Sequence, residues 1–187
     1  DALASAANYL TNSGWKRGEP WALEAILPAD IDYGLADGVK RPMSYWTSKG
    51  LTIGGGRTAA SNLKAELFVP AGAHGPAFFL YDNFYAIKTY NNADSYALSI
   101  GLLADRLAQR PELTRAWPTD ITMLNKTQVR TLQANLNQLG YDAGVVDGIA
   151  GRRTRSALQG FQKDRGLLAD GFPTMAMLQA VIEAANG

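Results

Sequence analysis

The sequence predicts an α+β domain with a small antiparallel hairpin, followed by an all-α bundle of three short helices. Apolar residues alternate with others over residues 63–69, and a second apolar run follows at residues 77–81; such a pair of runs is typical of a β-hairpin. Elsewhere apolar residues recur every three or four positions, which indicates amphipathic helices. Residues 111–124 contain two prolines and show little periodicity. We therefore expect a linker there, between domains at residues 1–110 and 125–187.

The composition limits the class of protein. A chain of 187 residues can bury about 70% of the surface that its unfolded form exposes, which is enough for a stable core. It contains no cysteine, which excludes disulfide bonds, thiolate zinc sites and a cysteine nucleophile. The formal net charge of +1 provides no basic surface of the kind that attracts nucleic acid. No apolar run approaches the roughly 18 residues that a membrane-spanning helix needs.

The chain opens inside a predicted helix over residues 1–13, which ends at Gly14, a residue suited to the position after a helix. It starts on Asp1, with neither an initiator methionine nor a signal peptide. We therefore expect a truncated or processed product rather than a whole gene product. The apolar side chains that share one face of this helix are Leu3, Ala6, Ala7 and Leu10.

A strand and a short helix are expected next. Apolar side chains alternate over residues 21–27, and a proline ends this predicted strand. Pro42 is suited to the first position of a helix, so we expect a helix over residues 42–49 with Met43 and Trp46 pointing inward.

The polar residues of the predicted sheet receive no catalytic or metal-binding role. The alternation places Glu24 and Glu66 on strands, where we expect them to face solvent; a solvated carboxyl group is a poor general acid at neutral pH. His74 is the only histidine and lies in the hairpin turn. Because no second histidine and no cysteine lie near it, we assign no metal site.

Residues 82–107 form the stretch around which we expect the first domain to be organised. Asp82 is placed to cap a short helix. A second helix follows, and its predicted buried stripe consists of Tyr96, Ile100, Leu103 and Leu107.

Tyr90, Asn91 and Tyr96 are predicted to meet at the corner between these two helices. This combination suits a sugar, because an aromatic face packs on a pyranose ring while the amide both donates and accepts hydrogen bonds. The alternative is structural: two core tyrosines with solvated hydroxyl groups, and an asparagine that caps a helix end.

The C-terminal part predicts three helices of a small bundle. Asn125 and Gln128 have the spacing of a capping box at the start of the first helix. The second helix buries Thr154, Ala157, Leu158 and Phe161, and the third starts at Pro173. Between the helices come two Asp-Gly pairs, Asp147-Gly148 and Asp170-Gly171. A role in forming turns is a simpler explanation for these aspartates than calcium binding.

The first domain resembles a known family. The motif N-F-Y-x-I-x-x-Y-N, starting at Asn83, and the run S-Y-A-L-S-I-G-L-L-A-D-R-L, starting at Ser95, are similar to the membrane-bound lytic transglycosylase B family, as are the segments at residues 1–10, 32–37 and 75–84. The resemblance covers roughly residues 1 to 108. It implies the C-terminal part of a lysozyme-like catalytic domain that binds glycan strands through Tyr90, Asn91 and Tyr96. Where members usually carry arginine before the Tyr-Asn pair, this chain has Thr89, preceded by Lys88.

The second domain resembles the three-helix peptidoglycan-binding domain of bacterial wall hydrolases. The motif is L-G-Y-D-x-G-x-x-D-G-x-x-G followed by T-x-x-A-L-x-x-F-Q. It implies contacts with the wall, for which Tyr141, Asp147 and Arg152 are the candidates. For Arg152 and its neighbours Arg153 and Arg155 the alternative is an ordinary solvated face.

The resemblance also implies that the catalytic acid lies outside this chain. In the family one glutamate acts as both acid and base, the muramyl 6-hydroxyl attacks, and a 1,6-anhydro end results. That glutamate lies upstream of the matched region, so we expect no catalytic residue in this chain, no cofactor, and a chain that is inactive by itself. None of Glu19, Glu24, Glu66, Glu112 and Glu183 stands in the family's catalytic motif.

The expected function is thus a portion of a peptidoglycan lytic transglycosylase of the bacterial cell envelope, periplasmic or associated with the outer membrane. Its expected partners are glycan strands, stem peptides and the N-terminal part of the same enzyme, but not nucleic acid. Two alternatives stay open: a non-catalytic wall-binding protein, and a lysozyme that uses water and a carboxylate from this chain.

Overall fold

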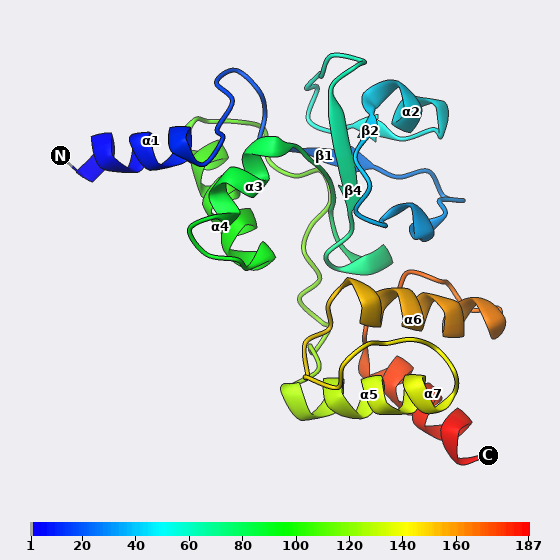
Figure 1. The fold of residues 1–187 in the computed structure, drawn as a ribbon. Coiled ribbons are helices and arrows are strands. Elements are labelled where there is room, and N and C mark those ends of the chain that lie inside the picture. The colour runs from blue at the N-terminus through cyan, green and yellow to red at the C-terminus, as the bar shows by residue number, and fades with distance from the viewer. Residues whose placement is uncertain (1) are drawn as a thin grey trace. The chain divides into compact units, whose positions relative to one another are not determined.

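The computed structural model describes residues 2–187; Asp1, the first residue of the predicted opening helix, lies outside them. The described chain forms two compact units, and Figure 1 shows their elements. The first unit contains the chain up to Ala29, Gly38–Phe68 and Pro76–Ala116, and the second contains Asp30–Asp37, Val69–Gly75 and Trp117–Gly187. Each unit has a hydrophobic core of its own.

The first unit is built on a five-stranded antiparallel sheet. In spatial order its strands are β2 (Arg41–Pro42), β4 (Lys64–Phe68), β5 (Ala77–Leu80), β1 (Ala22–Ile26) and β3 (Thr52–Ile53). The predicted hairpin is confirmed as β4 and β5, and the predicted strand at 21–27 is confirmed as β1. The sequence did not indicate β2 and β3, because a strand of two residues has no periodicity to detect.

Helices cover both faces of this sheet. On one face Phe79 packs against Trp46 of helix α2 (Met43–Ser48), with 5.9 Å between ring centroids, and the Trp46 indole donates a hydrogen bond to the Ala65 carbonyl. On the other face Phe78 and Leu80 belong to a core shared with helices α3 (Asp82–Lys88) and α4 (Asp94–Leu107). The central strands are therefore buried on both sides.

This covering corrects the expectation for the strand glutamates. Glu24 is 8% exposed and Glu66 is 5% exposed, so the prediction that they face solvent is wrong. Cross-strand pairing places Glu24 opposite Phe78 and Glu66 opposite Leu80, and paired residues point to the same face. Both carboxyl groups therefore lie on the face that α3 and α4 cover.

The buried stripe of α4 also differs from the predicted one. Ala97, Leu98 and Gly101 are buried, whereas Ile100, Leu103 and Leu107 are exposed. A side chain at Gly101 would collide with the indole ring of Trp21. Because the large Trp21 needs a small neighbour, α4 turns its small residues toward the core.

The role predicted for Asp82 as a helix cap is wrong as well. The residue before α3 is Tyr81, and no side chain caps this helix. Asp82 lies in the first turn instead, where its carboxylate forms ion pairs with Lys16, at 2.6 Å, and with Lys40. Helix α1 (Ala2–Asn12) confirms the helix expected at the start of the chain, and Gly14 follows it with a positive φ of 89°.

The second unit contains the three-helix bundle that the sequence predicts. Its helices are α5 (Lys126–Gln138), α6 (Arg152–Asp164) and α7 (Met175–Asn186). The capping box of Asn125 and Gln128 is present, and the four side chains expected to be buried on α6 are buried. Helix α7 starts two residues later than predicted, with Thr174 as its cap. Two 3₁₀ turns, Tyr33–Leu35 and Gly72–His74, belong to the same unit.

A first prediction concerns Glu24, whose carboxylate accepts hydrogen bonds from the backbone N–H of Thr114 and of Arg115 and from the Thr114 hydroxyl. In Glu24→Ala these partly buried donors lose their acceptor, so the free energy of unfolding in urea should fall by about 1 to 3 kcal/mol. Glu24→Gln keeps one acceptor oxygen and should lose less. Equal stability of Glu24→Ala and wild type would show that residues 114–115 do not depend on this carboxylate.

Candidate functional site

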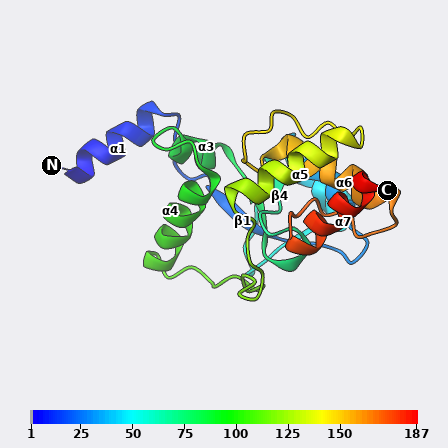
Figure 2. The same cartoon turned by 90° about the horizontal axis from the view of Figure 1, so that it is seen from below.

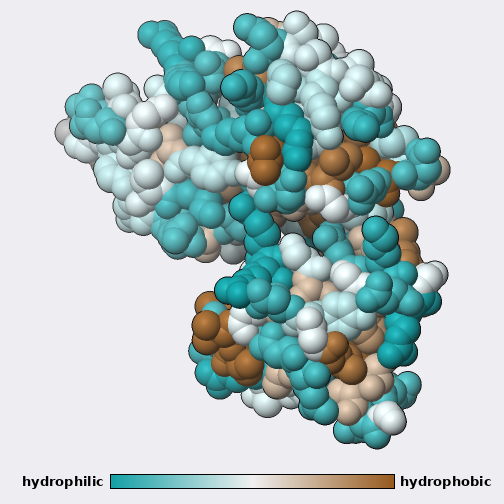
Figure 3. All heavy atoms as spheres, turned by 45° about the vertical axis from the view of Figure 1, so that its right-hand side comes forward, coloured by the Kyte–Doolittle hydropathy of each residue, from teal (hydrophilic) through white to brown (hydrophobic). Residues whose placement is uncertain are grey.

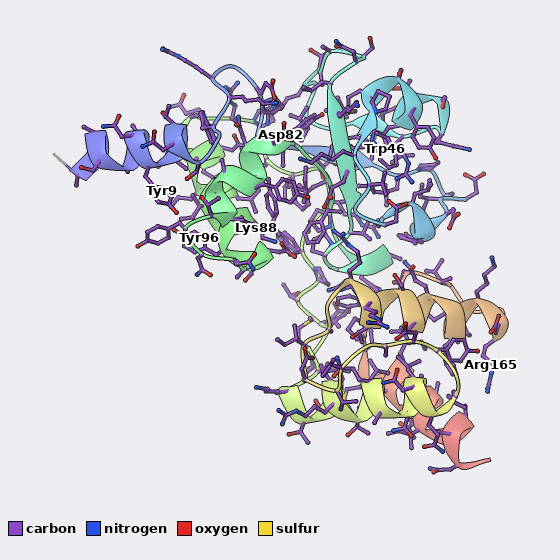
Figure 4. All side chains as sticks on the ribbon, viewed as in Figure 1. Tyr9, Trp46, Asp82, Lys88, Tyr96 and Arg165 are labelled. Atoms are coloured by element: carbon purple, nitrogen blue, oxygen red, sulfur yellow. The ribbon has the colours of Figure 1, made fainter. Side chains whose placement is uncertain are left out.

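Three tyrosines from three parts of the first unit form one exposed aromatic cluster. The rings of Tyr90 and Tyr96 stack at 5.9 Å with an interplanar angle of 25°, and Tyr9 meets Tyr90 edge-on, also at 5.9 Å. Tyr9 comes from α1, Tyr90 follows α3, and Tyr96 lies in the first turns of α4. Figure 2 shows α3 and α4 meeting beside the end of α1, and Figure 4 shows Tyr9 and Tyr96 on the same side of these helices. Tyr90 is 71% exposed.

The structure thus brings the predicted residues Tyr90, Asn91 and Tyr96 to one corner. The exposure of Tyr90 contradicts the alternative in which it is a core tyrosine, while Tyr96 is half-buried and packs on the core. Asn91 is exposed and does not cap α4, because the residue before that helix is Ala93, which has no side-chain cap. The side chain of Asn91 is therefore accessible beside the tyrosines.

A buried asparagine fixes the loop after α1 against α3. The Asn83 side chain is 0% exposed. Its oxygen accepts a hydrogen bond from the Lys16 N–H at 2.7 Å, and its amide donates to the carbonyls of Lys16 at 2.9 Å and Glu19 at 2.8 Å. These three hydrogen bonds, here called the Asn83 clip, hold the loop that follows α1, the helix that carries Tyr9.

The charges near the corner are already paired. Lys88 forms an ion pair with Asp94 at 2.6 Å across the turn between α3 and α4, and the Thr89 hydroxyl donates to the Ala86 carbonyl. Lys88 is therefore no free substitute for the arginine that the resembled family carries at position 89. Chemically the corner can pack against sugar rings and exchange hydrogen bonds with their hydroxyl and acetamido groups.

In the bundle Asp147 shapes a turn. One oxygen of its carboxylate accepts hydrogen bonds from the Ile149 N–H at 2.8 Å and from the Gln133 amide at 3.0 Å. The hydrogen bond from Gln133 is the largest cause that lowers the pKa of Asp147. These contacts agree with the turn role that the sequence favoured.

The other two wall-binding candidates of the bundle differ in their surroundings. The Tyr141 hydroxyl donates to Asp164 at 2.7 Å, and its ring packs edge-on against Phe161. The hydrogen bond to Asp164 raises the pKa of Tyr141. Arg152 is exposed in the first turn of α6. The structure thus gives Tyr141 a packing role and leaves Arg152 at the surface.

Residues 2–187 show neither a metal-binding cluster nor a membrane-spanning helix. No three histidine, aspartate or glutamate side chains gather as metal ligands do, and no described helix has the length and apolar character that a membrane crossing requires.

Sequence reasoning missed Tyr9 as a member of the site. Tyr9 belongs to no recognisable motif, and it lies outside the apolar face from which its helix is predicted. Its position beside Tyr90 depends on the Asn83 clip, which joins residues far apart in the sequence. Tyr9 lies within residues 1–10, the opening segment that resembles the family, just before the loop that Asn83 holds. This position was the only signal in the sequence that could have suggested Tyr9 as a member of the site.

Comparison with known proteins finds matches to both parts of the chain. Residues 1–105 match the family model of the transglycosylase SLT domain, and residues 125–181 match that of a peptidoglycan binding domain. A stretch of 43 residues is 51% identical to the N-acetylmuramoyl-L-alanine amidase CwlM of Mycobacterium tuberculosis, and it covers 23% of this chain and 11% of that protein.

Among solved structures, the chain is similar to SltB3 from Pseudomonas aeruginosa, crystallised in complex with NAG-anhNAM-pentapeptide. The identity is 44% and the TM-score is 0.90, over 97% of this chain and 50% of SltB3. A second SltB3 structure, in complex with NAG-NAM-pentapeptide, gives the same values. The chain therefore spans half the length of SltB3.

A second prediction concerns Asp82, which anchors α3. The hydrogen bonds from Lys16 and then Lys40 lower the pKa of Asp82. A group whose pKa is lowered on folding stabilises the protein above its unfolded pKa of about 3.9 and loses this contribution as the pH falls through the lower folded value. Asp82→Asn should therefore be less stable than wild type at pH 7, and the difference should vanish in acid.

Urea unfolding of both proteins at a series of pH values measures this difference. Asp30→Asn is the matched control, because Asp30 is exposed and forms no ion pair among the described residues. A difference that stays constant from pH 7 down to strong acid would contradict the assigned role of the Asp82 charge.

Proposed function

Because the chain belongs to the transglycosylase SLT domain family, we propose that it is a portion of a peptidoglycan lytic transglycosylase. The intact protein cleaves the β-1,4 bond between MurNAc and GlcNAc and forms a 1,6-anhydromuramyl end. The observation that carries this proposal is the exposed cluster of Tyr9, Tyr90 and Tyr96, together with the likeness to SltB3 in complex with NAG-anhNAM-pentapeptide.

In this proposal the chain binds and orients the glycan. The stacked rings of Tyr90 and Tyr96 offer an apolar surface for the faces of sugar rings, and Tyr9 extends that surface from α1. Asn91, exposed beside them, holds an acetamido or hydroxyl group by hydrogen bonds. Such contacts orient the reacting bond, and orientation is a substantial part of catalysis.

The proton donor comes from outside these residues. A glycosidic oxygen needs a carboxylic acid within hydrogen-bond reach. The carboxylate of Glu24 is occupied by Thr114 and Arg115, and that of Glu112 is paired with Arg106. Glu66 is buried on the sheet face beneath the helices. We therefore assign the catalytic glutamate to the part of the enzyme that SltB3 has beyond its match to this chain.

That remaining part is also the proposed partner of the first unit. Helix α4 exposes Ile100, Leu103 and Leu107, and α1 exposes Leu3. The three residues of α4 follow one another at helical spacing on one face, and a contiguous apolar patch marks an interaction surface. A polypeptide that supplies the rest of the domain would bury them and place its glutamate opposite the tyrosines.

The bundle is proposed to bind the wall. A module that holds the enzyme on its polymer raises the local substrate concentration without new chemistry. Because the polymer is peptidoglycan, we place the protein in the bacterial cell envelope, in the periplasm or at the outer membrane.

A third prediction tests whether this chain binds the wall but lacks the proton donor. Incubated with purified sacculi, the 187-residue chain alone should bind the sacculi and release no anhydromuropeptides, because it lacks the proton donor. Mass spectrometry of the supernatant distinguishes the outcomes: anhydro-ended products from the chain alone contradict the proposed absence of the acid. Products with reducing ends would indicate the lysozyme alternative. Binding without cleavage, even after the remaining part of the enzyme is added, would indicate the wall-binding alternative.

A fourth prediction concerns the aromatic surface. Loss of the ring in Tyr90→Ala removes a stacking contact worth about 0.5 to 1.5 kcal/mol, so binding of a peptide-free glycan should weaken about twofold to twelvefold. Isothermal titration calorimetry measures the affinity. Tyr45→Ala is the control, since the Tyr45 ring lies against Trp46 at α2. Equal losses in both variants would exclude a specific role for Tyr90.

A further inference from the structure

The bundle contains the same turn twice. At the first turn the Gln133 oxygen accepts from the Gly148 N–H at 2.9 Å and its amide donates to Asp147 at 3.0 Å. At the second turn Gln162 accepts from the Gly171 N–H at 2.8 Å and donates to Asp170 at 3.0 Å. In both turns the aspartate oxygen that receives the amide also accepts the N–H of the residue after the glycine.

The helix residues beside the two turns correspond as well. Gln162 follows Gln133 by 29 positions, and the same spacing relates Lys126 to Arg155 and Arg130 to Gln159. A side chain at Gly148 would meet Lys126 and Arg130, and one at Gly171 would meet Arg155 and Gln159. The two turns are therefore equivalent in their surroundings as well as in their hydrogen bonds.

The second turn holds a peptide segment of this chain. The other oxygen of the Asp170 carboxylate accepts the Ala73 N–H at 3.0 Å. Arg155 donates to the carbonyls of Val69 and Pro70, at 3.5 and 3.1 Å, and Phe172 is buried under Gly72. The turn thus supplies an acceptor for a backbone N–H, a donor for backbone carbonyls and an apolar floor.

A further donor at this second turn holds another segment. Gln159 donates a hydrogen bond to the Tyr33 carbonyl at 3.2 Å. Both helix positions beside the turn therefore bind backbone carbonyl groups.

The first turn presents the same groups at the surface. The second oxygen of Asp147 accepts no hydrogen bond from any other residue among residues 2–187. Within the same range, the side chains of Lys126 and Arg130 form no hydrogen bond or ion pair. Ile149, which corresponds to Phe172, is 66% exposed, and Val145, four positions earlier, is 78% exposed. Figure 3, coloured by the hydropathy of each residue, shows hydrophobic residues exposed among hydrophilic ones.

We propose that the first turn binds a segment of the murein stem peptide in the way that the second turn binds residues 69–73. The second oxygen of Asp147 accepts a backbone N–H of the stem peptide, Lys126 and Arg130 bind its carbonyl or carboxylate groups, and Ile149 forms the floor. The second turn has one cation at these positions and the first has two, which favours a peptide that ends in a carboxylate. This inference rests on the proposed wall-binding function and names the ligand of the bundle.

The test uses the full 187-residue chain, labelled with ¹⁵N, and two soluble probes: NAG-anhNAM-pentapeptide and the NAG-anhNAM disaccharide without peptide. The pentapeptide probe should shift the amide signals of Gly148 and Ile149, and the disaccharide should not. In the variant K126Q/R130Q the affinity for the pentapeptide probe should fall about tenfold, as expected for loss of charge-assisted hydrogen bonds.

The matched control is K163Q/R165Q, which removes one lysine and one arginine that are exposed at the end of α6 (Figure 4 labels Arg165). It should bind the pentapeptide probe as wild type does. Equal losses in the two double variants, or shifts at Gly148 and Ile149 with the disaccharide alone, would overturn the proposal. Concentration-dependent shifts of these signals without any probe would also overturn it, since a second copy would then occupy the turn.

Sedimentation with sacculi separates this proposal from the proposed function. If wild type binds sacculi but its Gly148 and Ile149 amide signals do not shift when the pentapeptide probe is added, the turn is not the binding site and the wall-binding function stands. If wild type does not bind sacculi at all, the wall-binding function itself fails.

Discussion

The packing of Trp21 against α4 is the constraint on which the candidate site depends. Gly101 leaves room for the indole ring, and one turn later Asp105 accepts the indole N–H at 3.1 Å. The same ring stacks on Phe84 of α3. A single side chain, next to the first residue of β1, thus fixes both helices against the sheet. Because Tyr96 is carried by α4 and Tyr90 follows α3, their stacking is a consequence of this contact.

Periodic elements could be predicted from the sequence, whereas features set by tertiary packing could not. The β4–β5 hairpin and the capping box at Asn125 follow from local patterns, and both were correctly expected. The side of α4 that is buried was predicted wrongly, because the choice depends on Trp21, 80 positions before Gly101. Likewise Tyr90 and Tyr96 could be placed together from their positions around a turn, while Tyr9 required the long-range clip of Asn83.

The buried glutamates of the first unit lie inside the fold, whereas Tyr9 and Tyr90 are exposed. Glu24 is buried on the sheet face that α3 and α4 cover, and its oxygens hold the backbone of residues 114–115. Both oxygens of this carboxylate are therefore engaged within the fold. The first unit therefore exposes the aromatic groups that we propose to bind a sugar, whereas the buried carboxylate of Glu24 serves the fold. In the second unit one hydrogen-bond pattern is used twice, once to hold this chain's own backbone and once at the surface.

We propose that the exposed tyrosines bind the glycan, while the proton donor belongs to another part of the enzyme. A crystal structure of this chain with NAG-anhNAM-pentapeptide tests that claim most directly. We expect sugar rings packed on Tyr90 and Tyr96, with Asn91 in hydrogen-bond contact and no carboxyl group of the chain near the MurNAc–GlcNAc linkage. Sugar bound elsewhere with these tyrosines bare, or a glutamate of this chain within about 3 Å of the glycosidic oxygen, would contradict it.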